Sequence, residues 1–229
     1  MKYKLGIDVG GTFTDFLLVD DEGNHEIFKS LTTPKDPFIG VNNGLQEIAK
    51  FTGQSQETFL NDLEIIVHGT TITTNAALTR NGAETAFITT KGFRDILNMR
   101  RGLRDRQYDS RYNPPEAFVK RRNIFTVEER VDRDGNIEVP LNEQEMATII
   151  DAMKEKNYEA IGVSTIFSYI NSANEKRIGE MLREAFPETY VSLSNEILPQ
   201  VRVYERNSTV ALNSYVGPIL SRYLDRAES

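Results

Sequence analysis

Apolar residues in the first third of the chain fall into three short β-prone runs that are separated by turn signals. The runs lie at residues 4–9, 12–20 and 25–33. Gly10 and Gly11 form the first turn, and residues 21–24 form the second. Strands joined by such tight turns predict an antiparallel meander. Asp36 and Pro37 then predict the start of a helix, because Asp is a favoured N-cap and Pro suits the first helical position.

Farther along, β-branched apolar runs alternate with segments of helical period. Strands are predicted at residues 63–67, 83–89, 160–166 and 189–193. Helices are predicted from residue 37 to about 53, at 72–80 and at 91–98. Two more helices are predicted to begin near residues 142 and 172. A final helix is predicted over 201–226, with a kink or break near Gly217 and Pro218. Ser172 and Glu175 are spaced as a capping box, and Gly40 and Gly44 predict that their helix packs closely against another element. This alternation favours a mixed sheet with helices on its faces.

Residues 100–140 interrupt the alternation. They are polar, basic and broken by prolines, and Asp134-Gly135-Asn136 predicts a hairpin turn. We therefore expect three parts: residues 1–99, an insertion of loops and small strands at 100–140, and a strand–helix part with a long final helix at 141–229.

Composition narrows the class of protein. Among 229 residues, 27 Lys and Arg stand against 34 Asp and Glu, which gives a net charge of −7 and argues against non-specific nucleic-acid binding. The chain has no Cys and only two His, so thiolate chemistry and a multi-His metal cage are excluded. No apolar run reaches the roughly 20 residues of a membrane span, and Asp8 interrupts the N-terminus too soon for a signal peptide. The expectation is a soluble, cytoplasmic protein.

The first candidate site is the sequence LGIDVGGTFTDFLLVD. A strand brings Asp8 to its end, and Gly10 and Gly11 permit positive φ and expose backbone N–H groups to an incoming anion. Thr12 and Thr14 add hydroxyl donors, and Asp15 follows at the start of the return strand. Such donors suit terminal phosphates, and a carboxylate suits Mg²⁺ held through water. The alternative is a plain hairpin with a Gly-Gly turn.

The second candidate site is VHGTTITTNAAL. A buried strand is predicted to stop at His68 and Gly69, after which Thr70 and Thr71 open a helix. Free N–H groups at a helix start attract anions, although either Thr could be a simple N-cap. Both turns are expected at the same edge of one sheet. His68 is either a satisfied buried histidine or a catalytic one.

These two motifs make the chain similar to the N-terminal region of the hydantoinase/oxoprolinase family. That family includes ATP-dependent N-methylhydantoinase, 5-oxoprolinase, caprolactamase and the ATP-binding subunits of acetone and acetophenone carboxylases. The similarity continues through ITTKGFRDIL, EERVDRDGNIEVPL and SLSNEILPQVRVYERNSTVALNSYV. It implies an α/β, ribonuclease-H-like fold of the actin, Hsp70 and sugar-kinase type. We expect a mixed five-stranded sheet whose first three strands are antiparallel and whose faces both carry helices.

The resemblance also implies cofactors and roles. ATP and Mg²⁺ are the expected cofactors, and Asp8 is the expected acid that positions the metal or the attacking water. The implied cofactor-binding residues are Gly10, Gly11, Thr12, Phe13, Thr14, Asp15, Gly69, Thr70, Thr71 and Asn75. In the lactam hydrolases of this family, ATP activates the amide oxygen as a phosphate ester, and water then opens the ring.

The expected function is that of the N-terminal ATP-binding domain of an ATP-dependent cyclic-amide hydrolase. The alternatives are the ATP-binding subunit of an acetone- or acetophenone-type carboxylase and a non-catalytic nucleotide-binding subunit. The expected partners are a cyclic amide or ketone substrate and a second half or companion subunit, in an oligomer without nucleic acid or membrane. Family members carry a second phosphate motif, which this chain lacks. We therefore expect weak nucleotide binding by the chain alone, and self-association through its final helix at Val210, Val216 and Leu220.

Three residues are candidates for the substrate side. His68 is one, and Arg94 and Asp95 of the Gly-Phe-Arg-Asp motif are the others, with a surface ion pair as the alternative. The arginine cluster at 100–106 could contact an anion or a partner subunit, or be a solvated insertion.

Overall fold

The computed structural model describes residues 2–33, 36–102, 106 and 108–228. The chain forms two compact units, of which the first contains Met1–Thr79 and Ile219–Ser229 and the second contains Arg80–Pro218. Each unit has its own sheet, and the two are described separately below.

The sheet of the first unit has four strands in the order β3-β2-β1-β4. They are β1 (Tyr3–Val9), β2 (Phe13–Asp20), β3 (His25–Leu31) and β4 (Leu63–Thr70). The first three strands pair antiparallel, which confirms the predicted meander, and β4 pairs parallel with β1. β4 extends beyond its predicted end because its pairing with β1 continues to the register pair Val9 and Thr70.

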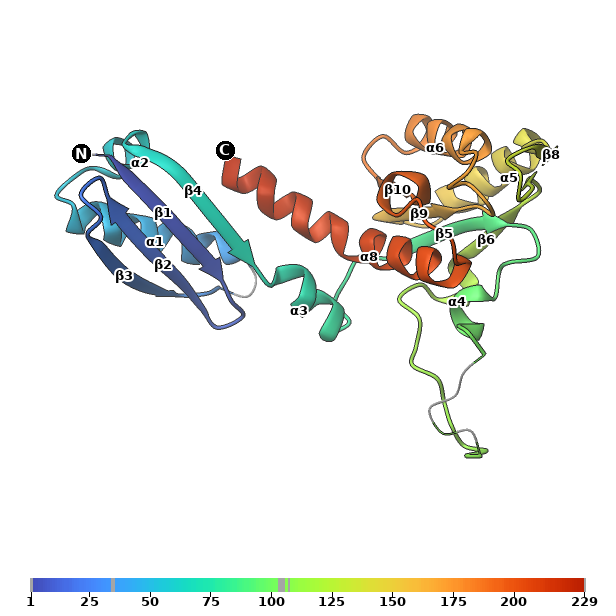
Figure 1. Cartoon of the computed structure of the whole chain (residues 1–229), viewed down its shortest axis with the longest axis horizontal. Coiled ribbons are helices and arrows are strands. Elements are labelled where there is room, and N and C mark those ends of the chain that lie inside the picture. Colours follow the sequence, from blue (N-terminus) through green and yellow to red (C-terminus); the bar gives the residue numbers. More distant parts are fainter. Residues whose placement is uncertain (1, 34–35, 103–105, 107, 229) are drawn as a thin grey trace. The chain divides into compact units, whose positions relative to one another are not determined.

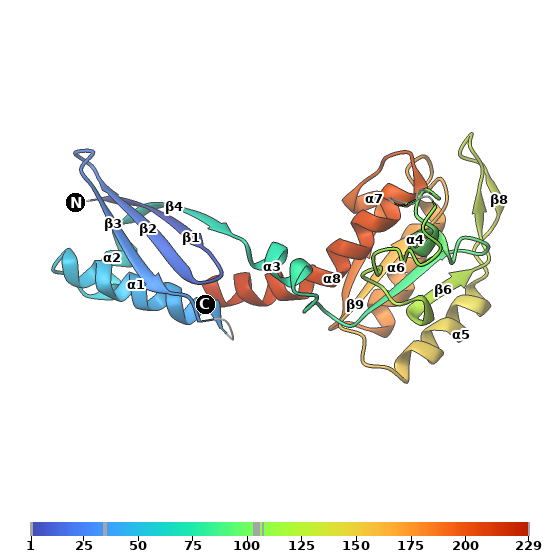
Figure 2. The same cartoon turned by 90° about the horizontal axis from the view of Figure 1, so that it is seen from below.

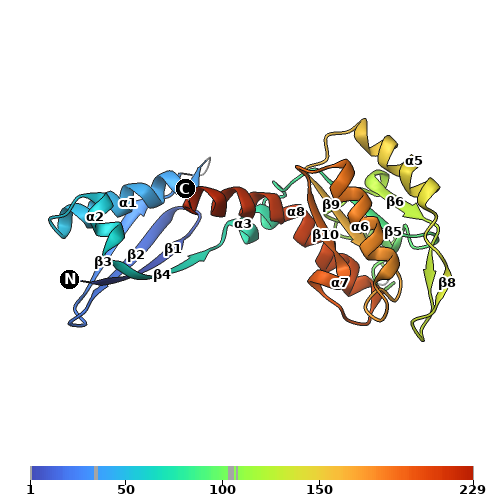
Figure 3. The same ribbon diagram turned by 90° about the horizontal axis from the view of Figure 1, so that it is seen from above.

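Helices α1 (Pro37–Phe51) and α2 (Gln56–Asn61) lie on one face of this sheet (Figures 2 and 3). Alternate strand residues and one stripe of α1 form the core on that side, which includes Leu5, Ile7, Phe16, Leu45 and Ile48. Gly44 lies directly against the ring of Phe16, which confirms the close packing predicted there. On the opposite face, which we call the open face, Leu17, Ile27 and Val67 are exposed.

The second unit contains a parallel sheet in the order β10-β9-β5-β6. Its strands are β5 (Thr85–Thr90), β6 (Ile124–Val127), β9 (Ala160–Ser164) and β10 (Tyr190–Leu193). Helices α5 (Glu143–Lys154) and α6 (Ala173–Ala185) pack on one face, and α8 (Val203–Glu228) contributes Val210 and Ala211 to the other (Figure 1). The predicted mixed α/β architecture is thus confirmed, and this unit has helices on both faces.

One expectation about the sheet was wrong. β5 is not the fifth strand of the first sheet but a central strand of the second, between β9 and β6. All six of its residues are buried, as a parallel strand covered on both faces requires. β6, which was placed within the insertion, also belongs to this sheet. The boundaries expected at 99/100 and 140/141 are therefore not the boundaries of the two units.

Short elements complete the second unit. They are α4 (Ile96–Met99), a 3₁₀ turn (Arg121–Asn123), the strands β7 (Arg130–Val131) and β8 (Ile137–Val139), and α7 (Ser194–Ile197). β7 and β8 form the predicted antiparallel hairpin, and Gly135 at its turn has a φ of 87°. The capping box at Ser172 was wrong, because the Glu175 carboxylate is buried and accepts hydrogen bonds from Thr165 N and Asn195 N at 2.7 and 2.8 Å.

α8 runs without a break through Pro218, so no helix break occurs at that position. Val210 is fully buried, and Val216 and Leu220 are partly buried. The apolar surface expected on this helix is therefore largely covered by the chain itself. Among the residues that the structure describes, none of the helices combines the length and apolar character that a bilayer crossing requires.

Candidate active site

The two predicted phosphate motifs meet at one edge of the first sheet. β1 and β4 run parallel, so that Asp8 lies beside Gly69, and Val9 lies beside Thr70. The backbone N–H of Thr71 donates to the carbonyl of Val9 at 3.2 Å. The turn after β1 and the turn after β4 are therefore joined directly, as their common sheet edge predicted. The residues between them form the candidate site.

The β1–β2 hairpin turn does not use the positive φ that Gly10 and Gly11 would permit. Gly10 N donates to Phe13 O at 3.0 Å, and neither Gly10 nor Gly11 belongs to the described glycines with positive φ. Glycine is needed here because a side chain would have little space. A Cβ on Gly10 would lie 3.0 Å from Phe13 O, and one on Gly11 would lie 3.2 Å from the amide nitrogen of Asn75. Gly11 and Thr12 are exposed, so their backbone groups are open to a ligand.

Asp8 lies on the open face at the end of β1 and is exposed. Its carboxylate lies across Gly69, where an added Cβ would approach Asp8 Oδ1 to 3.5 Å. Across the hairpin, its register partner is Asp15 on β2. Asp15 forms an ion pair with Lys29 of β3, with 3.0 Å between Oδ1 and Nζ. Two carboxylates thus stand side by side next to the glycine turn.

Thr14 does not take part in this surface. It is completely buried on the α1 side of the sheet, and its hydroxyl forms a 3.0 Å hydrogen bond with the hydroxyl of Thr32. The turn is further held by Thr32 N, which donates to Thr12 O at 3.0 Å. The strand alternation explains this placement, because Phe13 and Asp15 point to the open face and Thr14 points away from it.

The second motif folds into a tight turn followed by α3 (Ile72–Leu78). The Thr70 hydroxyl accepts a 3.2 Å bond from Ile72 N, whereas Thr71 occupies the N-cap position without a side-chain cap. The Thr71 hydroxyl instead accepts from Asn75 Nδ2 at 3.3 Å. These bonds fix Asn75 beside Gly11, so both motifs contribute to one small region.

His68 belongs to the covered side of the sheet, since its register partner is the buried Ile7. Its Nε2 lies 2.7 Å from the hydroxyl of Tyr223, and the two rings stack at 5.4 Å. Burial lowers the pKa of His68, while Asp8 partly opposes that shift. Burial also raises the pKa of Tyr223 to about 12, so the phenol keeps its proton and can donate to Nε2. These contacts support the hydrogen-bonded interpretation of His68, but the residue is exposed rather than buried as that interpretation expected.

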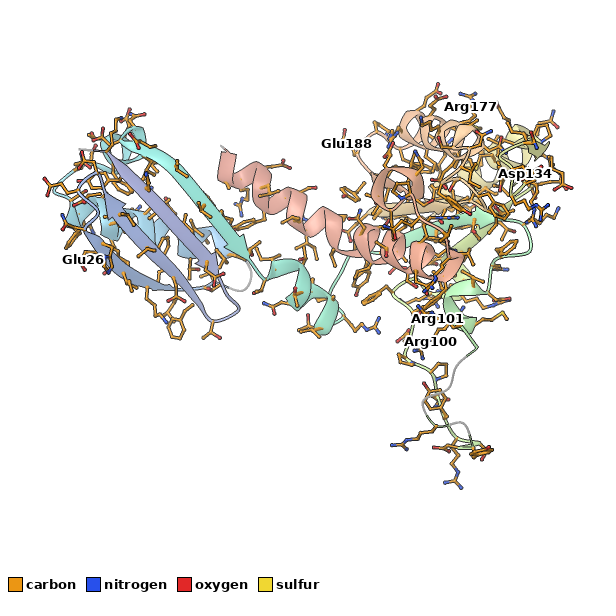
Figure 4. All side chains as sticks on the ribbon, in the orientation of Figure 1. Glu26, Arg100, Arg101, Asp134, Arg177 and Glu188 are labelled. Atoms are coloured by element: carbon orange, nitrogen blue, oxygen red, sulfur yellow. The ribbon has the colours of Figure 1, made fainter. Side chains whose placement is uncertain are left out.

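Arg94 and Asp95 lie in the second unit. Asp95 pairs with Arg121, which lowers the pKa of that carboxyl, and Arg94 donates to the carbonyl of Arg121 at 3.3 Å. Arg100 and Arg101 follow α4 (Figure 4), and Arg101 pairs with Glu205. Arg104 of the same cluster lies outside the described residues. Asp95 thus takes part in a surface ion pair, but its partner in that pair is Arg121 and not Arg94 of the same motif.

Two residues near the site were missed by sequence reasoning. Lys29 could have been found, because the tight turn at 21–24 sets a hairpin register that places it opposite Asp15. Tyr223 lies 155 residues from His68 in the chain, and no local pattern connects the two.

Comparison with known proteins identifies the family. Residues 4–186 match the hydantoinase/oxoprolinase N-terminal region. The chain belongs to the hydantoinase/oxoprolinase family. It is 35% identical to the caprolactamase subunit alpha of Pseudomonas jessenii over 100% of the chain and 33% of that protein. It is 33% identical to the acetophenone carboxylase gamma subunit of Aromatoleum aromaticum over 93% of the chain and 31% of that protein.

Solved structures of this family have the same fold. The crystal structure of the ATP-dependent caprolactamase from Pseudomonas jessenii matches 99% of the chain with a TM-score of 0.88 and 35% identity. A nucleotide-free acetone carboxylase structure matches 99% with a TM-score of 0.83 and 26% identity. The chain spans about a third of the length of these relatives, namely 33% and 34% of the two solved chains.

The residues present fit Mg²⁺ together with a phosphate ligand. Mg²⁺ is usually held by one or two carboxylates, with water and phosphate oxygens completing the shell. Asp8 and Asp15 offer two carboxylates, and Gly11 and Gly69 leave space that a side chain would fill. Within the described ranges, no group of three or more His, Cys, Asp and Glu side chains could enclose a metal by itself. A metal here would therefore need the phosphate as a ligand.

Proposed function

We propose that this chain is the N-terminal ATP-binding domain of an ATP-dependent cyclic-amide hydrolase. The observation that carries the proposal is the juxtaposition of Asp8, the Gly10-Gly11 turn and the Thr70-Thr71 turn at one sheet edge. The similarity to an ATP-dependent caprolactamase supports ATP as the nucleotide and a lactam-like ring as the substrate class.

In the proposed site, the exposed backbone of Gly11 and Thr12 binds the terminal phosphates. Asp8 and Asp15 would hold Mg²⁺, which neutralises phosphate charge when it is bound. Asn75 keeps its amide close to Gly11 and limits where a phosphate oxygen can lie. Because an amide is a poor electrophile, phosphorylation of its oxygen supplies the leaving group that water attack requires. The chain's contribution is to bind and orient the triphosphate for that transfer.

Revision is needed for two of the ten cofactor-binding residues named from sequence. The Thr14 side chain faces the core and can support the site only through its backbone and its bond to Thr32. Gly69 lies against the Asp8 carboxylate, where an added Cβ would be in ordinary contact with Oδ1 at 3.5 Å, and it supports the site through this position rather than by binding the nucleotide. The other eight stay proposed as binding residues, and His68, Arg94 and Asp95 are not given a substrate role.

An alternative function is that of the ATP-binding subunit of a ketone carboxylase. The observation that favours it is the similarity to the acetophenone carboxylase gamma subunit and to acetone carboxylase. Both reactions could use the same phosphate site, so the site does not separate them. Several relatives are subunits by name, which supports a companion subunit for this chain as well.

The test uses a complete enzyme that contains this chain. It is assayed for ATP-dependent opening of hydantoin, 5-oxoproline and caprolactam, and in parallel for ATP-dependent carboxylation of acetone and acetophenone. Ring opening coupled to ADP release supports the hydrolase. Carboxylation without ring opening supports the alternative, and binding of ATP with neither reaction supports a nucleotide-binding subunit.

A further inference from the structure

A lysine stands next to the proposed phosphate site on the open face of the first sheet. Lys29 of β3 faces Asp15 of β2, and its Nζ lies 3.0 Å from Asp15 Oδ1. The same ammonium lies 4.9 Å from the centre of the Phe13 ring, within the range of a cation–π contact. Phe13 is the first residue of β2 and lies next to the glycine turn, so the side chain of Lys29 leans toward that turn.

The strand register places Lys29 in one row with the two carboxylates of the proposed nucleotide site. Across the four strands, Lys29 lies beside Asp15, Asp15 beside Asp8, and Asp8 beside Gly69. Asp8 and Asp15 repel each other, and both would repel a triphosphate in the absence of cations. Lys29 is paired with one of the two carboxylates and therefore offsets part of this charge.

The ion pair is not needed to hold the sheet together. The side chains of Lys29 and Asp15 are 55% and 47% exposed, and pairs this accessible contribute little to folding. A long lysine side chain at such a place can exchange one anionic partner for another at small cost, because water screens both contacts. A divalent cation bound to Asp15 would release the ammonium, and the nearest new anion would be the terminal phosphate at the glycine turn.

We propose that Lys29 is a positioning residue of the nucleotide site, which neutralises Asp15 in the free protein and contacts the terminal phosphate of bound Mg·ATP. This inference rests on the proposed function, since it assumes that the Gly10-Gly11 turn binds the terminal phosphates. Beyond the proposed function, the contact of Lys29 with the terminal phosphate would explain how the site distinguishes a triphosphate from a diphosphate. Lys29 carries out no bond-making step in this role.

The experiment measures the binding of Mg·ATP and Mg·ADP to the 229-residue chain by NMR titration, which detects millimolar affinity. Lys29→Met should weaken Mg·ATP binding about tenfold and Mg·ADP binding less than about threefold, because only the triphosphate loses a charge-assisted contact. Lys29→Arg keeps the positive charge and should therefore bind Mg·ATP almost as tightly as the wild type. Lys4→Met is the matched control, since Lys4 is on the same face in the row of Val19 and Ile65, away from the turn.

The outcomes separate this inference from the proposed function. If neither nucleotide shifts the NMR signals of Gly10, Gly11 and Thr12 in the wild-type chain, the nucleotide site itself is refuted, and the role of Lys29 falls with it. If the wild type binds both nucleotides but Lys29→Met binds Mg·ATP unchanged, or loses both nucleotides equally, only the role of Lys29 is overturned. A structural effect of the substitution would reduce both affinities together, and the circular dichroism spectrum would report it.

Discussion

Asp8 is the residue on which the proposed chemistry depends most directly. It is exposed at the end of β1, and neighbouring groups leave room for its carboxylate. In a complete enzyme that contains this chain, Asp8→Asn should lower ATP-dependent turnover by at least roughly 10²-fold, the lower end of losses for a charge-stabilising group. Folding should be unchanged because the side chain is not part of the core. Glu26→Gln, at an exposed acid of β3 (Figure 4), is the control and should keep normal turnover.

Glu129 of the second unit should make stability depend on pH. Its carboxyl group is buried, and burial raises its pKa, while hydrogen bonds from Thr90 and Asn174 partly oppose the shift. Because the folded state prefers the protonated form, stability falls as the pH rises from the ordinary glutamate pKa through the raised one. Glu129→Gln should therefore raise the melting temperature at neutral pH more than at about pH 4. An equal change at both pH values would contradict this origin.

At the scale of elements, α1 is fixed against the meander by the contact between Gly44 and Phe16. A methyl group on Gly44 would overlap the Phe16 ring. Gly44→Ala should therefore lower the free energy of unfolding by about 1–3 kcal/mol through overpacking, although alanine favours the helix by roughly 1 kcal/mol. Asn43→Ala is the control one residue earlier, where the side chain is exposed and a slight gain is expected. Chemical denaturation measures both variants.

The end of α8 is held in the first unit by Tyr223. Its ring lies in the core, and its hydroxyl bonds to His68 at 2.7 Å. Tyr223→Phe keeps the packing and removes only the hydrogen bond, so it should lower stability by about 0.5–1.5 kcal/mol. Tyr223→Ala should cost about 3–5 kcal/mol because it also leaves a cavity. Equal losses in the two variants would show that the hydroxyl, not the ring, carries the contact.

At the scale of the whole molecule, the open face exposes apolar side chains that a protein surface rarely leaves uncovered. Ile27, Leu17, Gly6 and Val67 are successive register neighbours across the sheet, and Ile27 and Val67 are 72% and 67% exposed. The chain should self-associate through this face rather than through α8. Sedimentation should show weaker association for the double variant Ile27→Thr/Val67→Thr. Leu78→Thr, at a 77% exposed position on α3, should associate like the wild type.

Nucleotide affinity also belongs to this scale. The described site offers phosphate ligands from one side, and a two-sided cleft would gain much more from positioning and desolvation. The chain alone should therefore bind Mg·ATP with a dissociation constant in the millimolar range or weaker, about 4 kcal/mol or less. Calorimetry measures this value directly, and micromolar binding would show that the ligands on this chain are sufficient.

The sequence by itself determined the features that local chemistry controls. Gly10-Gly11 and the turn at 21–24 fixed the meander, and the two glycine- and threonine-rich motifs at the ends of β1 and β4 indicated the family and the candidate site. Only the tertiary structure decided which sheet β5 joins, because a buried apolar strand can pair equally well in either sheet until its neighbours are known. It also decided that Tyr223 meets His68. Both results depend on contacts between segments that are far apart in the chain, which local sequence patterns do not encode, whereas the alternation along β2 already accounts for Thr14 facing the core.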